Sequence, residues 1–237
     1  MKIALLGYGK MGRAIEDIAQ RRGHEIVARK TSTTPFEAAD LADVAIEFST
    51  PEAAVTNLEW AIDQRIPVVC GTTGWLHDYE KMVDRCHKAD AALLYASNFS
   101  LGVNLFFEVT QYVAQLMNNR PEYHVSIDEI HHTQKKDAPS GTAITMAEIV
   151  ASQTDDIDGW VLGKPQAGKI PIRALREPEV PGTHTLFYRS AIDSMSFTHT
   201  AHSREGFALG AVLAAEWMAG KKGVFSMKDV LGLHREK

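Results

Sequence analysis

The amino-acid sequence predicts an α/β protein in which a Rossmann-like, doubly wound parallel sheet is followed by a smaller α+β domain with an open mixed sheet. Three observations predict this architecture. Short, almost continuously apolar runs alternate with helical patterns over residues 2–96, as they do in βαβ units. A glycine-rich turn at residues 7–12 directly follows the first apolar run. Beyond residue 103, apolar and polar residues alternate within the strand candidates, which is typical of strands with one solvated face.

The first part of the chain is expected to form a dinucleotide-binding domain at residues 1–102. We expect its apolar runs to form strands at residues 2–6, 25–28, 44–48, 67–70 and 92–96. The patterns between them predict helices at residues 11–22, 51–64 and 76–88. Pro51 suits the start of the second helix, because proline at the first helical position removes no intrahelical hydrogen bond.

The second domain is expected at residues 103–205, and its strands favour mainly antiparallel pairing. It begins with an amphipathic helix at residues 103–117 and has a shorter helix at residues 143–151. Its strands are predicted at residues 124–130, 170–175, 183–188 and 194–200, and residues 154–169 are predicted to form a loop. Residues 206–237 contain a helix at residues 206–218 and a capping-box signature from Ser226 to Asp229. We expect this tail to return to the first domain.

The composition is that of a soluble globular protein, with 45% hydrophobic and 23% charged residues among 237. The net charge of −5 argues against a general nucleic-acid binder, which is usually basic. No apolar run reaches the roughly 18 residues that span a bilayer, and we expect neither export nor membrane insertion. Only two cysteines occur, so a disulfide framework is not expected and a reducing cytoplasm fits.

The turn Gly7-Tyr8-Gly9-Lys10-Met11-Gly12 matches the G-x-G-x-x-G pattern of dinucleotide-binding domains. In this pattern the first glycine makes a tight turn, the second lets a pyrophosphate approach, and the third lets the helix pack on the strand. The helix that follows offers unpaired N–H groups to the phosphates. The alternative is a glycine-rich turn that only connects two elements, but the strand before it and the helix after it favour a dinucleotide.

Arg29 and Lys30 follow the second predicted strand, at the place where an acidic residue usually binds the adenosine ribose. Arginine with lysine is the expected partner of a 2′-phosphate, so we predict that NADPH is preferred over NADH. Two solvated loop charges are the alternative interpretation, and NADH stays a second candidate cofactor.

Two more turns follow predicted strands at the same edge of the sheet. Ser49 lies after the third strand, and Gly71, Thr72 and Thr73 lie after the strand that ends at Cys70. Because ligands in such sheets bind beyond the carboxyl ends of the strands, we expect these turns to join the glycine-rich turn in one cofactor-binding edge. The alternative is that each turn only connects two elements.

The densest polar cluster of the chain runs from Asp128 to Thr142. His131 and His132 end a predicted strand and should point to opposite faces, so one imidazole can face a given cleft. Imidazole is the usual proton carrier near neutral pH, and Lys135 lies a short loop away, where its ammonium can pair with a carboxylate.

The segment Ser140-Gly141-Thr142 opens a predicted helix, whose first N–H groups can bind a second anion. Histidines with a purely structural role are one alternative. A zinc site that combines His131 or His132 with His199 and His202 is another, but their spacing is not that of an extended zinc motif, so no metal is expected. The chain has no G-x-S-x-G turn, which argues against a hydrolase of that type.

The order of these motifs resembles the 4-hydroxy-tetrahydrodipicolinate reductase (dihydrodipicolinate reductase) family over almost the whole chain. The motifs that carry the resemblance are residues 7–12, Phe48-Ser49-Thr50, Gly71-Thr72-Thr73-Gly74, residues 96–104, Glu129-Ile130-His131-His132, Lys135, residues 137–142, residues 181–184 and residues 225–231. The adjacent histidines followed by Lys135 and Asp137-Ala138-Pro139-Ser140-Gly141-Thr142 are the most specific of them.

The resemblance implies hydride transfer from NADPH or NADH to a cyclic imine dicarboxylate, which gives tetrahydrodipicolinate in lysine and diaminopimelate biosynthesis. It implies that His131 donates a proton, that Lys135 assists, and that the substrate carboxylates bind at His132, Gly141 and Thr142. For the nicotinamide and its ribose it implies Gly71 to Thr73 with Ala96, Ser97, Asn98 and Phe99. The family resemblance also implies a homotetramer formed through the sheets of the second domains.

Two features depart from the family pattern. Arg29-Lys30 replaces the acid commonly found there, and the segment from Lys30 to the third strand is short. Closure of the two domains about Gly102 and residues 204–206 is expected to bring the reacting carbons together. Two other interpretations stay open: another two-domain nicotinamide oxidoreductase, such as an amino-acid or semialdehyde dehydrogenase, and a nucleotide-sensing regulator without turnover.

Overall fold

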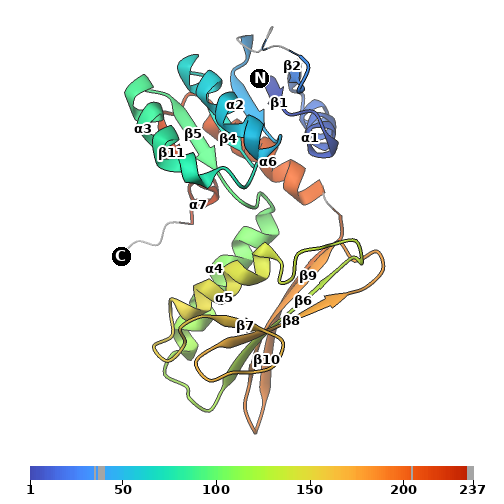
Figure 1. Ribbon diagram of the computed structural model, residues 1–237, viewed down its shortest axis with the longest axis vertical. Coiled ribbons are helices and arrows are strands. Elements are labelled where there is room, and N and C mark those ends of the chain that lie inside the picture. Colours follow the sequence, from blue (N-terminus) through green and yellow to red (C-terminus); the bar gives the residue numbers. More distant parts are fainter. Residues whose placement is uncertain (35, 37–40, 204, 234–237) are drawn as a thin grey trace. The chain divides into compact units, whose positions relative to one another are not determined.

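The computed structural model describes residues 1–34, 36, 41–203 and 205–233. It divides into two compact units, Met1–Leu101 with Glu205–Lys237, and Gly102–Arg204. Each unit has its own sheet (Figure 1). Each unit also has its own core of buried side chains. Residue 204 of the expected hinge and part of the short segment after Lys30 lie outside the described residues.

The first unit contains a six-stranded parallel sheet in the order β11-β5-β4-β3-β1-β2. Its strands are β1 (Lys2–Leu6), β2 (Glu25–Lys30), β3 (Val44–Glu47), β4 (Val68–Cys70), β5 (Ala92–Tyr95) and β11 (Gly223–Phe225). From β1 the chain adds β2 on one side and then β3 on the other side, so the order of the strands reverses at β1. Such a switch point is where these sheets bind ligands. The predicted Rossmann-like sheet is confirmed, with β11 as a strand that the sequence did not predict.

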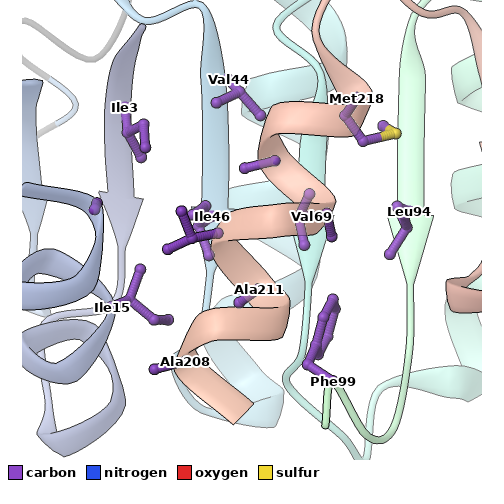
Figure 2. Close-up of a cluster of buried hydrophobic side chains, with 14 of the residues drawn as sticks. Ile3, Ile15, Val44, Ile46, Val69, Leu94, Phe99, Ala208, Ala211 and Met218 are labelled. Atoms are coloured by element: carbon purple, nitrogen blue, oxygen red, sulfur yellow. The ribbon is translucent and has the colours of Figure 1, made fainter. Parts of the chain in front are cut away.

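Helices cover both faces of this sheet, which explains why its central strands β1, β3, β4 and β5 are almost continuously apolar. The helical elements are α1 (Lys10–Arg21), α2 (Pro51–Asp63), the 3-10 turn η2 (Leu76–Asp78), α3 (Tyr79–Ala89), α6 (Glu205–Met218) and α7 (Met227–Val230). Successive strand residues face opposite sides, so Ile3 packs with α1 and α6 (Figure 2), whereas Leu6 packs with α2 and α3. The capping box is formed, since Asp229 accepts a hydrogen bond from the backbone N–H of Ser226 at 2.7 Å.

The second unit is built on a five-stranded mixed sheet in the order β10-β9-β6-β8-β7. Its strands are β6 (His124–His131), β7 (Trp160–Leu162), β8 (Ile170–Arg176), β9 (Gly182–Arg189) and β10 (Ser194–Ala201). Helices α4 (Leu101–Met117) and α5 (Gly141–Ala151) each pack one face, which includes Phe106 and Met146, against Ile127 and Leu186 of the sheet. The open mixed sheet that the sequence predicts is confirmed.

Two expectations for this unit are wrong in detail. Strand β8 pairs in parallel with both β6 and β7, so two of the four strand pairings are parallel, more than a mainly antiparallel sheet would have. Alternation of apolar and polar residues reports which face of a strand is buried and says nothing about strand direction. The predicted loop at residues 154–169 contains β7, a three-residue strand too short to show a period.

Across the described ranges, no helix combines the length and apolarity that crossing a membrane requires. Cys70 and Cys86 are both free and buried. Burial, together with the nearby Glu47 carboxyl, raises the pKa of the Cys70 thiol well above its ordinary value, so this cysteine is held as an unreactive thiol.

Candidate functional site

The turns after β1, β3 and β4 surround a cavity of about 360 Å³ at one edge of the first sheet. The residues that line it are Gly9, Lys10, Met11, Phe48, Ser49, Pro51, Gly71, Thr72 and Thr73. The structure therefore brings together the three turns that the sequence analysis expected at one edge of the sheet. Phe48 and Pro51 were not among those predicted residues, because an apolar side chain in a turn gives no signal of a pocket wall.

The three glycines of the first turn have different surroundings. Gly7 has a φ of +115°, and a Cβ there would lie 2.0 Å from the carbonyl oxygen of Phe48. A Cβ at Gly12 would lie 2.4 Å from the carbonyl oxygen of Gly7, where α1 packs on the turn. A Cβ at Gly9 would have no atom within 4 Å. Packing thus requires the first and third glycines, whereas the second faces the open space of the cavity.

Hydrogen bonds fix the other two turns to each other. The backbone N–H of Ser49 donates to Thr72 Oγ1 at 2.8 Å, and the indole N–H of Trp75 donates to the carbonyl oxygen of Thr72 at 2.8 Å. Behind them Glu47 is fully buried and accepts hydrogen bonds from Ser49 and, at 3.2 Å, from Asn57. The cavity wall is therefore held in shape by the protein's own contacts.

Arg29 and Lys30 are the last two residues of β2, which is longer than the predicted strand. Arg29 forms an ion pair with Glu16 of α1, and Tyr8 donates a hydrogen bond to the same carboxylate. The Arg29 hydrogen bond lowers the pKa of Glu16 despite partial burial. Lys30 Nζ lies 4.6 Å from the ring centroid of Phe36. Sequence reasoning missed Glu16, because this acid comes from the helix before the strand.

The remaining predicted cofactor residues, Ala96 to Phe99, follow β5 and lie outside the lining of the cavity. Phe99 is 2% exposed, and its ring centroid lies 5.5 Å from that of Phe48. Ala96 donates its backbone N–H to the carbonyl oxygen of Cys70 at 3.2 Å, and Asn98 Oδ1 accepts from Ser100 at 2.9 Å. Phe99 therefore supports the cavity wall from behind.

In the second unit, a cluster of buried polar side chains surrounds His131 at the end of β6. Glu129 is fully buried and bonds His131 Nδ1, and the two residues lie two positions apart on the same strand. Because strand side chains alternate between faces, this spacing puts them on the same side of the sheet. The Glu-x-His spacing was present in the sequence but was not recognised as a pair.

Arg176 connects this pair to the loop that carries Lys135. Its Nη1 donates to Glu129 at 3.0 Å, and its Nη2 donates to the carbonyl oxygen of Asp137 at 2.7 Å. Lys135 Nζ in turn pairs with Asp137 Oδ2 at 2.8 Å, which lowers the pKa of that carboxyl. The ammonium that we predicted to bind a substrate carboxylate thus has a carboxylate partner from its own loop.

The start of α5 lies next to the same cluster. Ser140 is the N-cap of α5, accepts a hydrogen bond from the backbone N–H of Ala143 at 3.3 Å and bonds His184 Nε2 at 3.1 Å. It is 2% exposed, whereas Gly141 is exposed and Thr142 and His132 are half-buried. Of the predicted substrate-binding residues, Ser140 therefore serves the fold of the helix start, and Gly141 faces open space.

His184 of β9 stands directly opposite Glu129 of β6, and its ring lies 5.1 Å from that of His131. Burial, followed by the charge of His131, lowers the pKa of His184 to about 3. Its imidazole is therefore neutral at any physiological pH. The sequence analysis placed His184 in a family motif but gave it no role beside His131, because the two are more than fifty residues apart and only strand pairing brings them together.

The depressed pKa of His184 predicts a pH dependence of stability. Below the ordinary value of 6.5 the unfolded chain binds a proton that the folded chain refuses, so folding becomes less favourable as the pH falls. His184 alone lowers the free energy of unfolding by up to about 1.4 kcal/mol for each pH unit below 6.5, until the pH approaches 3. Urea unfolding of a His184→Asn variant at pH 4.5 to 7 should show a shallower pH dependence than wild type. Parallel curves would contradict the assignment.

Glu129, His131 and His184 also place ligand atoms within 4.8 Å of one another, the geometry of a possible metal site. Sequence reasoning considered a different set, with His199 and His202. A cation at these three residues would have to displace the contact between Glu129 and His131 and would face the guanidinium of Arg176. The charges of the cluster thus favour a proton over a metal ion.

Comparison with known proteins identifies the family. The model described as "Dihydrodipicolinate reductase, N-terminus" matches residues 1–99, and the model described as "Dihydrodipicolinate reductase, C-terminus" matches residues 102–231. The chain belongs to the dihydrodipicolinate reductase family. The 4-hydroxy-tetrahydrodipicolinate reductase of Christiangramia forsetii is 53% identical over 98% of both chains. That of Syntrophus aciditrophicus is 36% identical over 80% of this chain and 73% of its own length.

A solved member of the dihydrodipicolinate reductase family has the same fold. The dipicolinate-bound enzyme of Paenisporosarcina sp. TG-14 superimposes with a TM-score of 0.78 at 20% identity, over 97% of this chain and 98% of its own. Membership makes this chain an oxidoreductase that uses a nicotinamide dinucleotide. The residues of the first unit fit such a cofactor, because the cavity lies at the sheet's switch point beside the N-terminus of α1, where backbone N–H groups favour phosphate.

Proposed function

We propose that this protein reduces the cyclic imine formed from 4-hydroxy-tetrahydrodipicolinate to tetrahydrodipicolinate, with NADPH as the preferred hydride donor. The observation that carries the proposal is the buried Glu129–His131 pair beside Lys135 and the start of α5, in a chain whose first unit has a cavity at the switch point of its parallel sheet. The family resemblance alone supports a cytoplasmic homotetramer as the active form.

The polar cluster of the second unit suits this reaction. The bound dinucleotide supplies the hydride, and the negative charge that develops on the conjugated substrate has to be neutralised by a proton. We assign this proton to His131, with Lys135 as the cation beside it. The backbone N–H groups at Gly141 and Thr142 and the side chain of His132 hold the two carboxylates of the substrate. One carboxylate replaces Asp137 as the partner of Lys135.

The direct test couples the purified protein to the upstream synthase and follows the loss of reduced nicotinamide absorbance. We expect turnover that depends on the synthase product. Cofactor binding without turnover would instead favour a nucleotide-sensing regulator. A thermal shift with pyridine-2,6-dicarboxylate at saturating NADPH separates the remaining alternatives, because a dehydrogenase for an amino acid or a semialdehyde has no site for a planar diacid.

The proposed preference for NADPH rests on Arg29 and Lys30 at the end of β2. In this position their two positive charges suit a 2′-phosphate. Glu16 already engages Nε and Nη2 of Arg29, which fixes the guanidinium but also places a carboxylate beside the proposed phosphate. The preference therefore depends on the balance between two cations and one anion.

Replacing Arg29 by Asp and Lys30 by Ala together should lower the ratio of kcat/KM for NADPH to that for NADH by roughly 10- to 100-fold. Because Glu16 offsets one of the two cations, the net loss is about one charge-assisted hydrogen bond, worth about 1.5–3 kcal/mol. Steady-state kinetics with both cofactors measures the ratio. Arg85→Ala is the matched control, since Arg85 is a surface arginine of the same unit that pairs with Asp63. An unchanged ratio in the double variant would rule out the proposed clamp.

A further inference from the structure

We infer that Glu129 is the positioning residue of the proton donor: it fixes which nitrogen of His131 keeps its proton, and through Arg176 it ties that histidine to the loop of Lys135. The inference rests on the proposed function, because it takes His131 as the donor. It adds a residue that touches neither substrate nor cofactor in the proposed reaction.

The contacts of Glu129 determine its protonation state. Burial raises the pKa of this carboxyl, but hydrogen bonds from His131 and Arg176 outweigh burial and bring the pKa below its ordinary value. Glu129 is therefore a carboxylate at neutral pH, in a position where no water reaches it, since its side chain is 0% exposed. A buried carboxylate can only accept hydrogen bonds, so the contact to His131 requires a proton on Nδ1.

The other ring nitrogen of His131, Nε2, points toward a glycine. His131 Nε2 faces Gly182 of β9, and a Cβ at that glycine would lie 3.0 Å from Nε2. A side chain at position 182 would cover the nitrogen that Glu129 leaves available. Glu129 on one side and a glycine on the other thus select Nε2 as the atom that gives up the proton.

The proton transfer from His131 balances without a change at Glu129. In the reactive state the ring carries protons on both nitrogens. The N–H bond at Nε2 breaks as a C–H bond forms on the substrate, and the ring is left neutral with its remaining proton on Nδ1. Glu129 accepts that Nδ1–H bond before and after the transfer and stays ionised throughout. The pair therefore needs no rearrangement during the step.

Arg176 connects Glu129 to the loop of Lys135. Its guanidinium balances the buried charge of Glu129, and the same guanidinium donates to the backbone of the Lys135 loop at Asp137. Strand pairing sets this arrangement, because Arg176 stands directly opposite His131 in the parallel register of β6 and β8. Asp128, the residue before Glu129, stands opposite Arg173 in the same register. The two form a salt bridge in which the arginine is exposed. This pair offers a matched control.

The tautomer of His131 tests the inference in the unaltered protein. Long-range ¹H–¹⁵N correlation spectra of histidine-labelled protein report which nitrogen carries the proton, and His131→Gln assigns the signal. In spectra of the singly protonated ring, we expect the proton on Nδ1 in wild type and in Asp128→Asn. We expect Glu129→Gln to shift the proton at least partly to Nε2. A wild-type ring with its proton on Nε2 would overturn the inference.

Kinetics provides the second readout. Glu129→Gln should lower kcat by at least about tenfold, with the KM for NADPH unchanged, whereas Asp128→Asn should match wild type. In the His131→Gln background the same change should cost little more, because the two residues act as a unit. Since Glu129→Gln leaves Arg176 without its buried partner, the double variant Glu129→Gln with Arg176→Met, which removes both charges, guards against loss of fold.

The outcomes separate this inference from the proposed function. If Glu129→Gln changes the tautomer but not kcat, Glu129 does not position the donor, and the inference is wrong while the proposed function stands. If His131→Gln itself keeps full turnover, the assignment of the donor fails, and the inference fails with it. A low kcat with an unchanged tautomer in a folded variant would also overturn the inference, because it would show a different role for the carboxylate.

Discussion

Replacing His131 by Gln is expected to lower kcat by roughly 10²- to 10⁴-fold, while the affinity for NADPH stays within about twofold of wild type. This range is the usual contribution of a positioned general acid. Glutamine has a similar reach and a hydrogen-bond donor but cannot release a proton at neutral pH. The loss should therefore appear in the chemical step and not in cofactor binding, since the cofactor cavity belongs to the other unit.

Single-turnover kinetics and a fluorescence titration of NADPH measure the two quantities separately. His124→Gln is the matched control, because His124 is an exposed histidine at the other end of the same strand. It should leave both quantities unchanged. Retained turnover in His131→Gln would remove this residue from the proposed role, and lost cofactor affinity would show that the substitution disturbs more than proton transfer.

Most of the first unit could be predicted from the sequence, because its signals are local. Buried parallel strands are continuous apolar runs such as residues 3–6, and a glycine turn between strand and helix has a strict spacing. The carboxyl ends of parallel strands share one edge, so the turns at Ser49 and Gly71 could be assigned to one place before any coordinates. The structure brings both of them to the cavity that Gly9 also lines.

The polar cluster around His131 could be predicted only in part, because half of it comes from other strands. The sequence places Glu129 and His131 two residues apart, but Arg176 and His184 reach them through the register of β8 and β9. Register depends on long-range packing, which no local pattern encodes. The same limit explains Glu16 of α1. The helix α1 connects β1 to β2, and the parallel pairing of these strands brings Arg29 at the end of β2 beside Glu16.

The short strands β7 and β11 were missed for a different reason. Each has three residues, fewer than a period-two pattern needs to be recognised. Both lie at an edge of their sheet, where one neighbouring strand supplies all of the pairing. The pairing partner, rather than the intrinsic preference of the segment, determines such strands.

Replacing Gly7 by Ala is expected to destabilise the first unit by about 3 kcal/mol. The backbone at Gly7 has a φ of +115°, which costs a residue with a side chain about 1–3 kcal/mol. The new methyl group would also meet the carbonyl oxygen of Phe48 at 2.0 Å, so backbone has to move. A loss of this size lowers the Tm by roughly 6–12 °C in a protein of this length, which thermal denaturation measures.

Gly9→Ala makes the same chemical change two residues away and should have the opposite signature. Its backbone, with φ −90° and ψ −151°, is extended and lies outside the left-handed region that favours glycine, and the methyl group would meet no atom within 4 Å. We therefore expect the Tm to stay within about 2 °C of wild type, because no packing is disturbed. The methyl group would instead occupy the wall of the cavity where the pyrophosphate is proposed to lie, so the Kd for NADPH should rise at least about tenfold. If Gly9→Ala binds NADPH as tightly as wild type, the pyrophosphate does not pass over this turn, and the second glycine has only a connecting role.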